Sequence, residues 1–296
     1  MAARSQQVTI ETATIPAYAS ALAWDGPAVA VDPEVVPVGA GAEARAAFAL
    51  SLDAVNFGSG WFPTLRKRPG RSGYFTIALA LRRRFDSDPA FFTAERLRLL
   101  DARTMARTLG QDPDHALMAH YGAALRELGE RVALDHDGHF LALVRAAGGS
   151  AERLAQTLAS WPGWHDAIAY DGRIVPFYKR AQIAASDLHA AGLLVGSDLH
   201  RLTLFADNLV PHVLRIDGVL GYRPELAERI DGGGLLEHGS PEEVEIRACA
   251  LHAVELMVAA RGADLCAARV DAILWRRGGE PAYKALPRHR TRCTAY

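Results

Sequence analysis

The chain has 296 residues, half of them apolar, and a formal net charge of −1 from 33 Lys and Arg against 34 Asp and Glu. This length and composition allow a sizeable buried core. The balanced charge argues against a general affinity for nucleic-acid backbones, and no apolar run approaches the ~20 residues of a membrane-spanning helix.

The spacing of the cysteines and the composition of the first residues indicate the cellular compartment. Cys249, Cys266 and Cys293 are far apart and show no CxxC spacing, so neither a disulfide framework nor a zinc site is indicated. The N-terminus lacks the apolar core of a signal peptide. We therefore expect reduced thiols and a cytoplasmic location.

Residues 1–40 are expected to form a short irregular arm, and residues 41–296 a single helical core. Residues 8–10 and 29–31 suit short extended pieces. Pro16, Pro27, Pro33 and Pro37 are expected to break any helix in this segment.

The first predicted helix covers residues 42–57, with Gly58 as its C-terminal cap. Asn56 and Phe57 lie at its end. From the residues alone, Asn56 caps the helix and Phe57 belongs to the core. A second apolar helix is predicted over 73–85, ending in three arginines that suit the negative end of the helix dipole.

Helix signals then follow one another with little strand-like alternation, which favours a mainly α fold. Tyr170-Asp171-Gly172-Arg173 is the one hairpin-like turn. Further helices are predicted over 93–110, with Thr93 as cap, after Asp112-Pro113, and after Ser150. The remaining ones are predicted over 175–191, within 198–214 where Pro211 limits or kinks the helix, after Ser240, and over 265–276 as the last.

Lys179 and Arg180 stand beside the buried stripe of the 175–191 helix. Two interpretations are open. In one, both side chains reach solvent or pair with acids, and Arg180 is the partner of a buried carboxylate. In the other, one or both face a pocket and neutralise a phosphate.

An apolar run over 202–214 carries one carboxylate, Asp207. An ionised Asp among such residues costs several kcal/mol unless it is paired or hydrogen-bonded. Asp207 is therefore either neutralised by a structural partner or kept for chemistry. Asp271 is a second acid in apolar surroundings, whereas Glu245 and Arg247 fit structural roles.

Four segments in this order resemble the queuosine salvage proteins, which are queuosine 5'-phosphate N-glycosylases. The resemblance covers the chain from about residue 52 to its end. Its motifs are Pro176-Phe177-Tyr178-Lys179-Arg180-Ala181-Gln182-Ile183, the run around Asp207, Glu243-Val244-Glu245-Ile246-Arg247-Ala248 and Arg288-His289-Arg290-Thr291-Arg292-Cys293.

The resemblance implies a fold like that of the helical DNA glycosylases, and hydrolysis of the N-glycosidic bond of queuosine 5'-phosphate to release queuine. It implies that Asp207 stabilises the positive charge that develops on the ribose or activates water. Asp271 would line the base site and pair with the secondary amine of the base's side arm. Phe205 and Phe57 would stack on the base beside Asn56.

Lys179 is the candidate for the 5'-phosphate, with Arg180 as a further substrate-binding candidate, and the basic C-terminal segment is expected to close the site or shield its acids. No metal or cofactor is expected, and the substrate is a small nucleotide. Two alternatives stay open, a glycosylase acting on DNA or tRNA and a non-catalytic helical binding protein. The sequence does not settle the oligomeric state.

Overall fold

The computed structural model describes residues 2–22, 32–196, 198–262 and 265–296, and within them the fold is mainly helical, as predicted. Four short strands, β1 Val8–Ile10, β2 Ala167–Tyr170, β3 Arg173–Pro176 and β4 Leu220–Tyr222, form two antiparallel pairs, β1 with β4 and β2 with β3. The α-helices are α1 Ile15–Ala21, α2 Ala42–Ala54, α3 Gly73–Ser87, α4 Ala94–Leu97, α5 Ala102–Leu109, α6 Ala116–Asp135, α7 Phe140–Ala146, α8 Ala151–Ala159, α9 Lys179–Ala190, α10 Val210–Ile216, α11 Pro224–Asp231, α12 Pro241–Arg261, α13 Ala267–Arg277 and α14 Pro281–Lys284.

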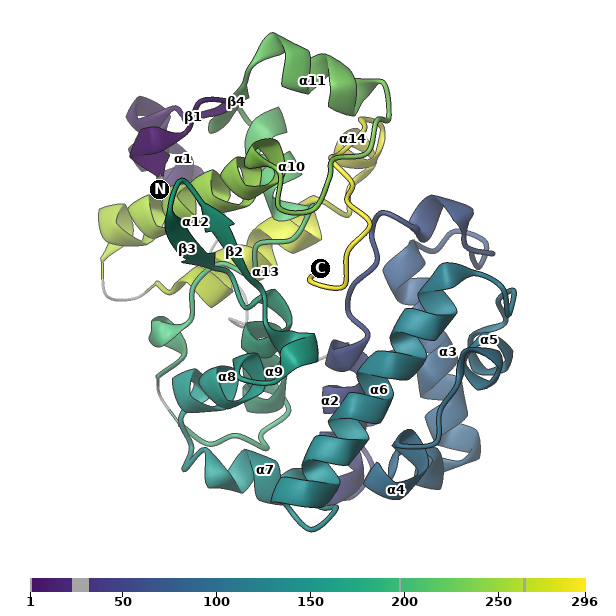
Figure 1. Cartoon of the computed structure of the whole chain (residues 1–296). Coiled ribbons are helices and arrows are strands. Elements are labelled where there is room, and N and C mark those ends of the chain that lie inside the picture. Colours follow the sequence, from purple (N-terminus) through teal and green to yellow (C-terminus); the bar gives the residue numbers. More distant parts are fainter. Residues whose placement is uncertain (1, 23–31, 197, 263–264) are drawn as a thin grey trace.

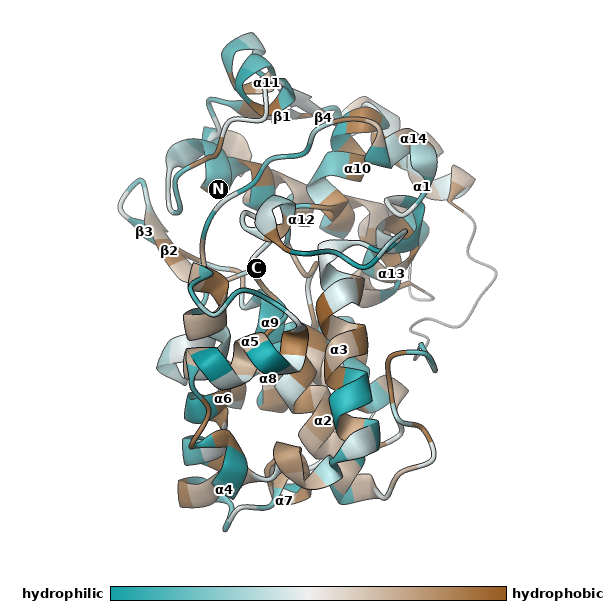
Figure 2. Ribbon diagram, turned by 90° about the vertical axis from the view of Figure 1, so that its right-hand side faces the viewer, coloured by the Kyte–Doolittle hydropathy of each residue, from teal (hydrophilic) through white to brown (hydrophobic). Residues whose placement is uncertain are grey.

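The buried apolar residues form two main clusters. One lies among α2 to α9 in the lower half of Figure 1, and the other among α1, α10, α12 and α13 in the upper half. Figure 2 shows apolar residues on helices of both halves, alongside polar residues on the same helices. Among the described residues no helix is long and apolar enough to cross a membrane. The single-domain assignment and the likeness to helical DNA glycosylases stay predictions.

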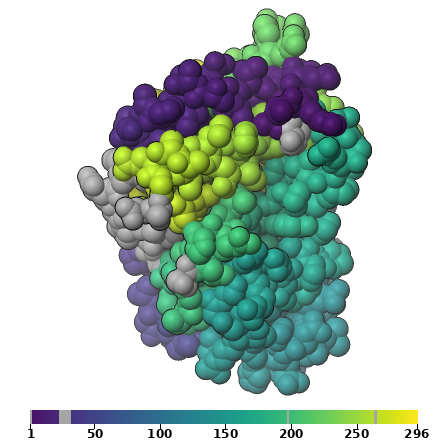
Figure 3. Space-filling model, turned by 90° about the vertical axis from the view of Figure 1, so that its left-hand side faces the viewer, coloured from purple at the N-terminus to yellow at the C-terminus, as the bar shows by residue number. Residues whose placement is uncertain are grey.

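The N-terminal segment packs on the upper cluster. Val8–Ile10 pairs with Leu220–Tyr222 as β1 with β4, and α1 lies against α12, so the purple residues of Figure 3 cover the top of that helix. The expectation that Pro16 breaks any helix here is wrong. Pro16 stands in the first turn of α1, where its missing N–H costs no intrahelical bond. The extended piece expected at 29–31 lies outside the described residues.

Two predicted helix ends near the later site are wrong by several residues. α2 ends at Ala54 with Val55 as its cap, whereas Gly58 lies beyond it at φ +99° and donates its N–H to Tyr296 O at 2.9 Å. α9 begins at Lys179, because residues 173–176 pair in β3. The Tyr170–Arg173 turn is confirmed as the hairpin between β2 and β3.

The helices predicted in the middle of the chain are present with shifted bounds. The one predicted over 93–110 divides into α4 and α5, and Thr93 makes no side-chain cap. α6 is capped by His115 rather than opened by Asp112-Pro113. Ser150 and Ser240 cap α8 and α12 as expected. α1, α7, α11 and the short α14 were not predicted, so α13 is not the last helix.

The segment around Asp207 is non-helical rather than a helix kinked by Pro211. Residues 202–206 have no regular secondary structure, and α10 begins at Val210 with Pro211 in its first turn. Asp207 therefore precedes a helix instead of lying within one.

Candidate functional site

A cavity of about 890 Å³ lies where the two clusters meet, a size typical of small-molecule sites. Its walls come from the 32–36 segment, α2 and the turn after it, α3, α9, the 205–209 segment, α13 and the C-terminal segment. Six of the seven predicted site residues line it: Asn56, Phe57, Lys179, Phe205, Asp207 and Asp271.

The Asp207 carboxylate is held by the main chain at the start of α10. Its Oδ1 accepts the N–H groups of Leu209 at 2.6 Å and Val210 at 3.2 Å. These bonds fix the side chain while leaving Asp207 partly exposed to the cavity. The Asp207 carboxylate is thus both hydrogen-bonded to the main chain and accessible from the cavity, so the two interpretations from the sequence do not exclude each other.

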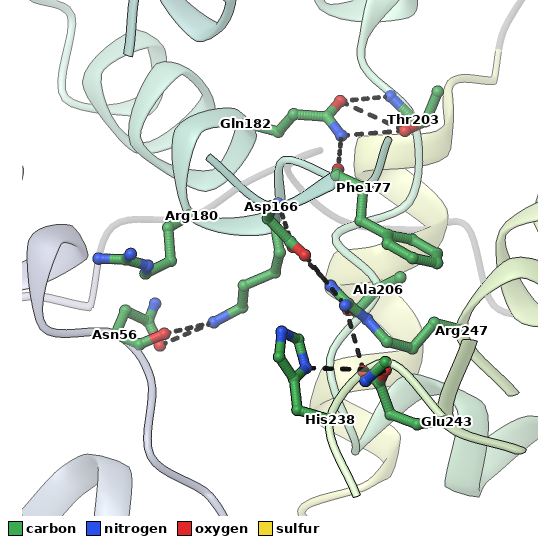
Figure 4. A network of polar contacts seen from close by, with 12 residues as sticks. Asn56, Asp166, Phe177, Arg180, Gln182, Thr203, Ala206, His238, Glu243 and Arg247 are labelled. Carbon is green, nitrogen blue, oxygen red and sulfur yellow. Dashed lines mark hydrogen bonds and ion pairs between the residues drawn. The ribbon is translucent and has the colours of Figure 1, made fainter. Parts of the chain in front are cut away.

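Buried polar contacts fix the segment that carries Asp207 from behind (Figure 4). Arg247 donates to Ala206 O at 2.9 Å and forms an ion pair with Asp166 at 2.5 Å, and both side chains are nearly inaccessible. Gln182 accepts the N–H of Thr203 at 2.8 Å. A paired Arg at this depth is structural, as the sequence indicated for Arg247.

Asp271 lies on α13 beside this segment and is 8% exposed. Burial raises the pKa of its carboxyl well above the usual range, and the nearby charge of Asp207 raises it further, against the opposing Lys179 charge and a backbone hydrogen bond from Phe205. Burial therefore favours the neutral form of the Asp271 carboxyl.

Lys179 lies between the acids and α2. Its amine donates to Asn56 O at 2.7 Å and Asn56 Oδ1 at 3.0 Å, and its side chain is almost fully buried. Burial lowers its pKa, an effect that the carboxylates of Asp207, Asp53 and Asp271 oppose. The amine is thus the central cation of an acidic cavity.

Arg180 is the one predicted site residue that does not line the cavity. It donates to the carbonyl oxygens of Ala54, at 2.6 Å, and Gly163, and its guanidinium lies over the rings of Phe57 and Trp164. These contacts assign it a structural role between α2 and the turn before β2.

Aromatic rings line the cavity on several sides. Phe205 and Phe57 were expected, and Tyr74 and Trp275, which meet edge to face at 5.8 Å, join them. One face of Phe57 is occupied by Arg180, which leaves Phe205 as the freer of the two predicted stacking residues.

Two acids were missed by the sequence analysis. Asp187 lines the cavity from α9, and burial raises its pKa to about 7. Asp53 lies behind it on α2, 1% exposed, and its pKa is raised well above the usual range by burial and by the Asp187 charge. The helical spacing of Lys179, Ile183 and Asp187 places all three on one side of α9, a signal that was available in the sequence.

The sequence analysis also did not predict that three cations come together at this cavity. Lys67, Arg288 and Arg290 line the same cavity, and Arg288 lies close enough to Asp207 for that carboxylate to affect its pKa. Burial lowers the pKa of Lys67, and so do its neighbours Arg290 and Arg288.

The C-terminal segment brings two of these cations to the cavity. It is fixed by the bond from Asn208 Nδ2 to His289 O at 3.2 Å and by the N–H of Leu236 on Arg290 O at 2.9 Å. The expectation that this segment folds back onto the site agrees with these contacts.

No group of three or more His, Cys, Asp or Glu residues suited to a metal ion occurs within the described part of the chain. Cys249, Cys266 and Cys293 are free thiols.

Comparisons with known proteins give the family of this chain. The family model described as "Queuosine salvage protein" matches residues 37–296. A protein of Sphaerobacter thermophilus is 37% identical over 267 residues, which cover 86% of this chain and 83% of that protein. Relatives from Dictyostelium discoideum (32% identical, 84% of this chain and 77% of that protein) and Bos taurus (29%, 76% and 72%) are also similar. All three are named "Queuosine 5'-phosphate N-glycosylase/hydrolase".

Proposed function

This chain belongs to the queuosine salvage protein family, and from that premise we propose that it hydrolyses the N-glycosidic bond of queuosine 5'-phosphate and releases queuine. The observation that carries the proposal is that Asp207 and Asp271 line one cavity, beside a group of cations. Separate surfaces for the two acids would have contradicted it.

Asp207 has the catalytic role. Cleavage of the bond builds positive charge on the ribose, and a carboxylate fixed beneath the anomeric carbon stabilises that charge. The N–H groups of Leu209 and Val210 hold the Asp207 carboxylate in place without covering its second oxygen. That oxygen is free to orient and deprotonate the attacking water.

The base lies against Phe205 and Asp271. Phe205 supplies a flat apolar surface, and Trp275 from α13 lines the same cavity. The base is a 7-deazapurine without a ring N7, so protonation at that position cannot assist its departure. Burial raises the pKa of Asp271 well above its usual range, and a protonated carboxyl at this position is able to donate a hydrogen bond to the base edge.

The 5'-phosphate fits the cations Lys67, Arg288 and Arg290 better than Lys179. The Lys179 amine already donates to both oxygens of Asn56 and is surrounded by carboxylates. The other three cations repel one another, and a phosphate between them would relieve that repulsion through charge-assisted hydrogen bonds.

We also propose that the substrate is a free nucleotide and the location cytoplasmic. The net charge of −1 gives no general attraction to a nucleic-acid backbone, and the three cations line the cavity together with buried acids. The free thiols of all three cysteines suit a reducing compartment.

The test is incubation with queuosine, queuosine 5'-phosphate and guanosine 5'-phosphate, with the free base measured by mass spectrometry. We expect release of queuine, fastest from the 5'-phosphate, and none of guanine. Absence of queuine release from the 5'-phosphate would overturn the proposal. Base release from DNA or tRNA, weakening steeply with salt, would favour a nucleic-acid glycosylase instead.

A further inference from the structure

The charged residues that line the cavity fall into two groups. Arg288 is influenced by Asp207 and Arg290, and Lys67 by Arg290 and Arg288, so these three cations lie near one another and near Asp207. Asp187 on α9 acts instead on Asp53 of α2 and on Asp271. Such a division of charge fits a ligand that carries both an anion and a cation.

Neither Asp187 nor Asp53 forms an ion pair within the described part of the chain. The charge of Lys179 lowers the pKa of both acids, but its amine donates its hydrogen bonds to Asn56. Burial raises the pKa of Asp187 and of Asp53, which favours the neutral form of both acids.

A second observation beside Asp187 points to a ligand. Ser186, next to Asp187 on α9, lines the cavity and is fully buried, and its hydroxyl has no hydrogen-bond partner among the described residues. Buried hydroxyls are almost always hydrogen-bonded, so a ligand group is expected there.

We propose that Asp187 and Ser186, with Asp53 behind them, form the subsite for the protonated secondary amine on the side arm of the base, which makes Asp187 a specificity-determining residue. A secondary ammonium has two N–H donors, one for the Asp187 carboxylate and one for the Ser186 oxygen. Its charge stabilises the ionised form of Asp187. This inference deepens the proposed function and rests on it for the identity of the arm.

The family resemblance implies Asp271 as the partner of this amine, but two features favour Asp187. Asp271 adjoins Asp207, the carboxylate proposed to face the sugar, and lies against the backbone of Phe205. Asp187 lies farther along α9, beside Tyr74 of α3, whose pKa burial and the Asp187 charge raise. The arm therefore extends away from the sugar, and Asp271 is left for the base itself.

The experiment measures Kd by calorimetry for two free bases, queuine, which carries the amine, and 7-cyano-7-deazaguanine, which carries a neutral nitrile. Asp187→Asn is isosteric with the protonated carboxyl and should fold, which circular dichroism checks. We expect Asp187→Asn to weaken queuine binding by about 10- to 100-fold, the scale of a hydrogen bond to a charged group, and to leave nitrile binding unchanged.

Two control variants and a second test variant separate loss of the Asp187 charge from a general loss of structure. Asp187→Glu, which retains the charge, should bind queuine more tightly than Asp187→Asn, and Asp86→Asn, an exposed acid, should change neither Kd. If Asp187→Asn fails to fold, Ser186→Ala should still weaken queuine alone.

Equal losses for both bases, or no loss for queuine, would overturn the inference. Because free bases are measured, this outcome is independent of the proposed function, whose failure appears as absent queuine release from queuosine 5'-phosphate.

Discussion

A carboxylate in an apolar run has to be stabilised locally, and Asp207 shows how this is done without removing it from the cavity. Two main-chain N–H groups at the start of α10 donate to one of its oxygens. Sequence reasoning posed a structural and a chemical role as alternatives, but hydrogen bonding to one oxygen leaves the other accessible. The two roles are compatible in one residue.

Asp207→Asn is expected to keep the fold, because the Asn oxygen still accepts the N–H groups of Leu209 and Val210. It should lower kcat by about 10²-fold or more, the scale of a positioned acid–base or electrostatic group. Base release under saturating queuosine 5'-phosphate measures kcat, and the Kd of free queuine serves as the control. Near-normal turnover would remove Asp207 from the mechanism.

Asp187 should affect stability in a pH-dependent way. Its folded-state pKa of about 7 lies above the ordinary 3.8, so the ionised form is disfavoured by folding. Stability is thus lost as pH rises from near 3.8 to near 7, and no more is lost above that. The groups that face it are Lys179 on α9, Asp53 on α2, Tyr74 on α3 and Asp271 on α13.

Asp187→Asn removes this penalty. We expect the gain in Tm over the unchanged protein to grow between pH 5 and pH 7 and to level off above, as measured by thermal unfolding without ligand. Asp86→Asn, in an exposed ion pair with Arg82, is the matched control. A gain that stays constant across this range would contradict the raised pKa of Asp187.

At the scale of elements, α9 and the C-terminal segment supply opposite charges to the cavity. α9 was predicted four residues too long at its start, because the β3 pairing of residues 173–176 does not show in helical periodicity. The four-residue spacing of Lys179, Ile183 and Asp187 nevertheless predicts that these residues share one side of α9. The C-terminal segment carries no regular helix, and its position depends on contacts such as Asn208 to His289 that only the folded chain creates.

Arg288→Gln tests the C-terminal segment. The KM for queuosine 5'-phosphate should rise about tenfold through loss of a charge-assisted hydrogen bond, while the KM for the nucleoside queuosine should not change. Steady-state base release from the two substrates gives this comparison. Arg292→Gln, an exposed arginine in the same segment, is the control and should alter neither value. An equal rise for both substrates would place the phosphate elsewhere.

At the scale of the whole molecule, the cavity exists because two apolar clusters meet around polar residues from distant parts of the chain. The mainly α fold and six cavity residues were predictable, since caps, periodicity and local motifs are read over short distances. The grouping of Lys67 with Arg288 and Arg290 could not be predicted, because no short-range pattern connects the loop after α2 to the end of the chain. Arg180 was left with both a structural and a substrate-binding interpretation, because a helical pattern gives a residue's neighbours but not which side faces the cavity.

The most direct test of the account is an experimental structure of the Asp207→Asn protein with uncleaved queuosine 5'-phosphate. The account predicts the phosphate among Lys67, Arg288 and Arg290, the anomeric carbon facing residue 207, and the amine of the side arm on Asp187. A nucleotide bound in the reverse direction, or outside this cavity, would contradict it.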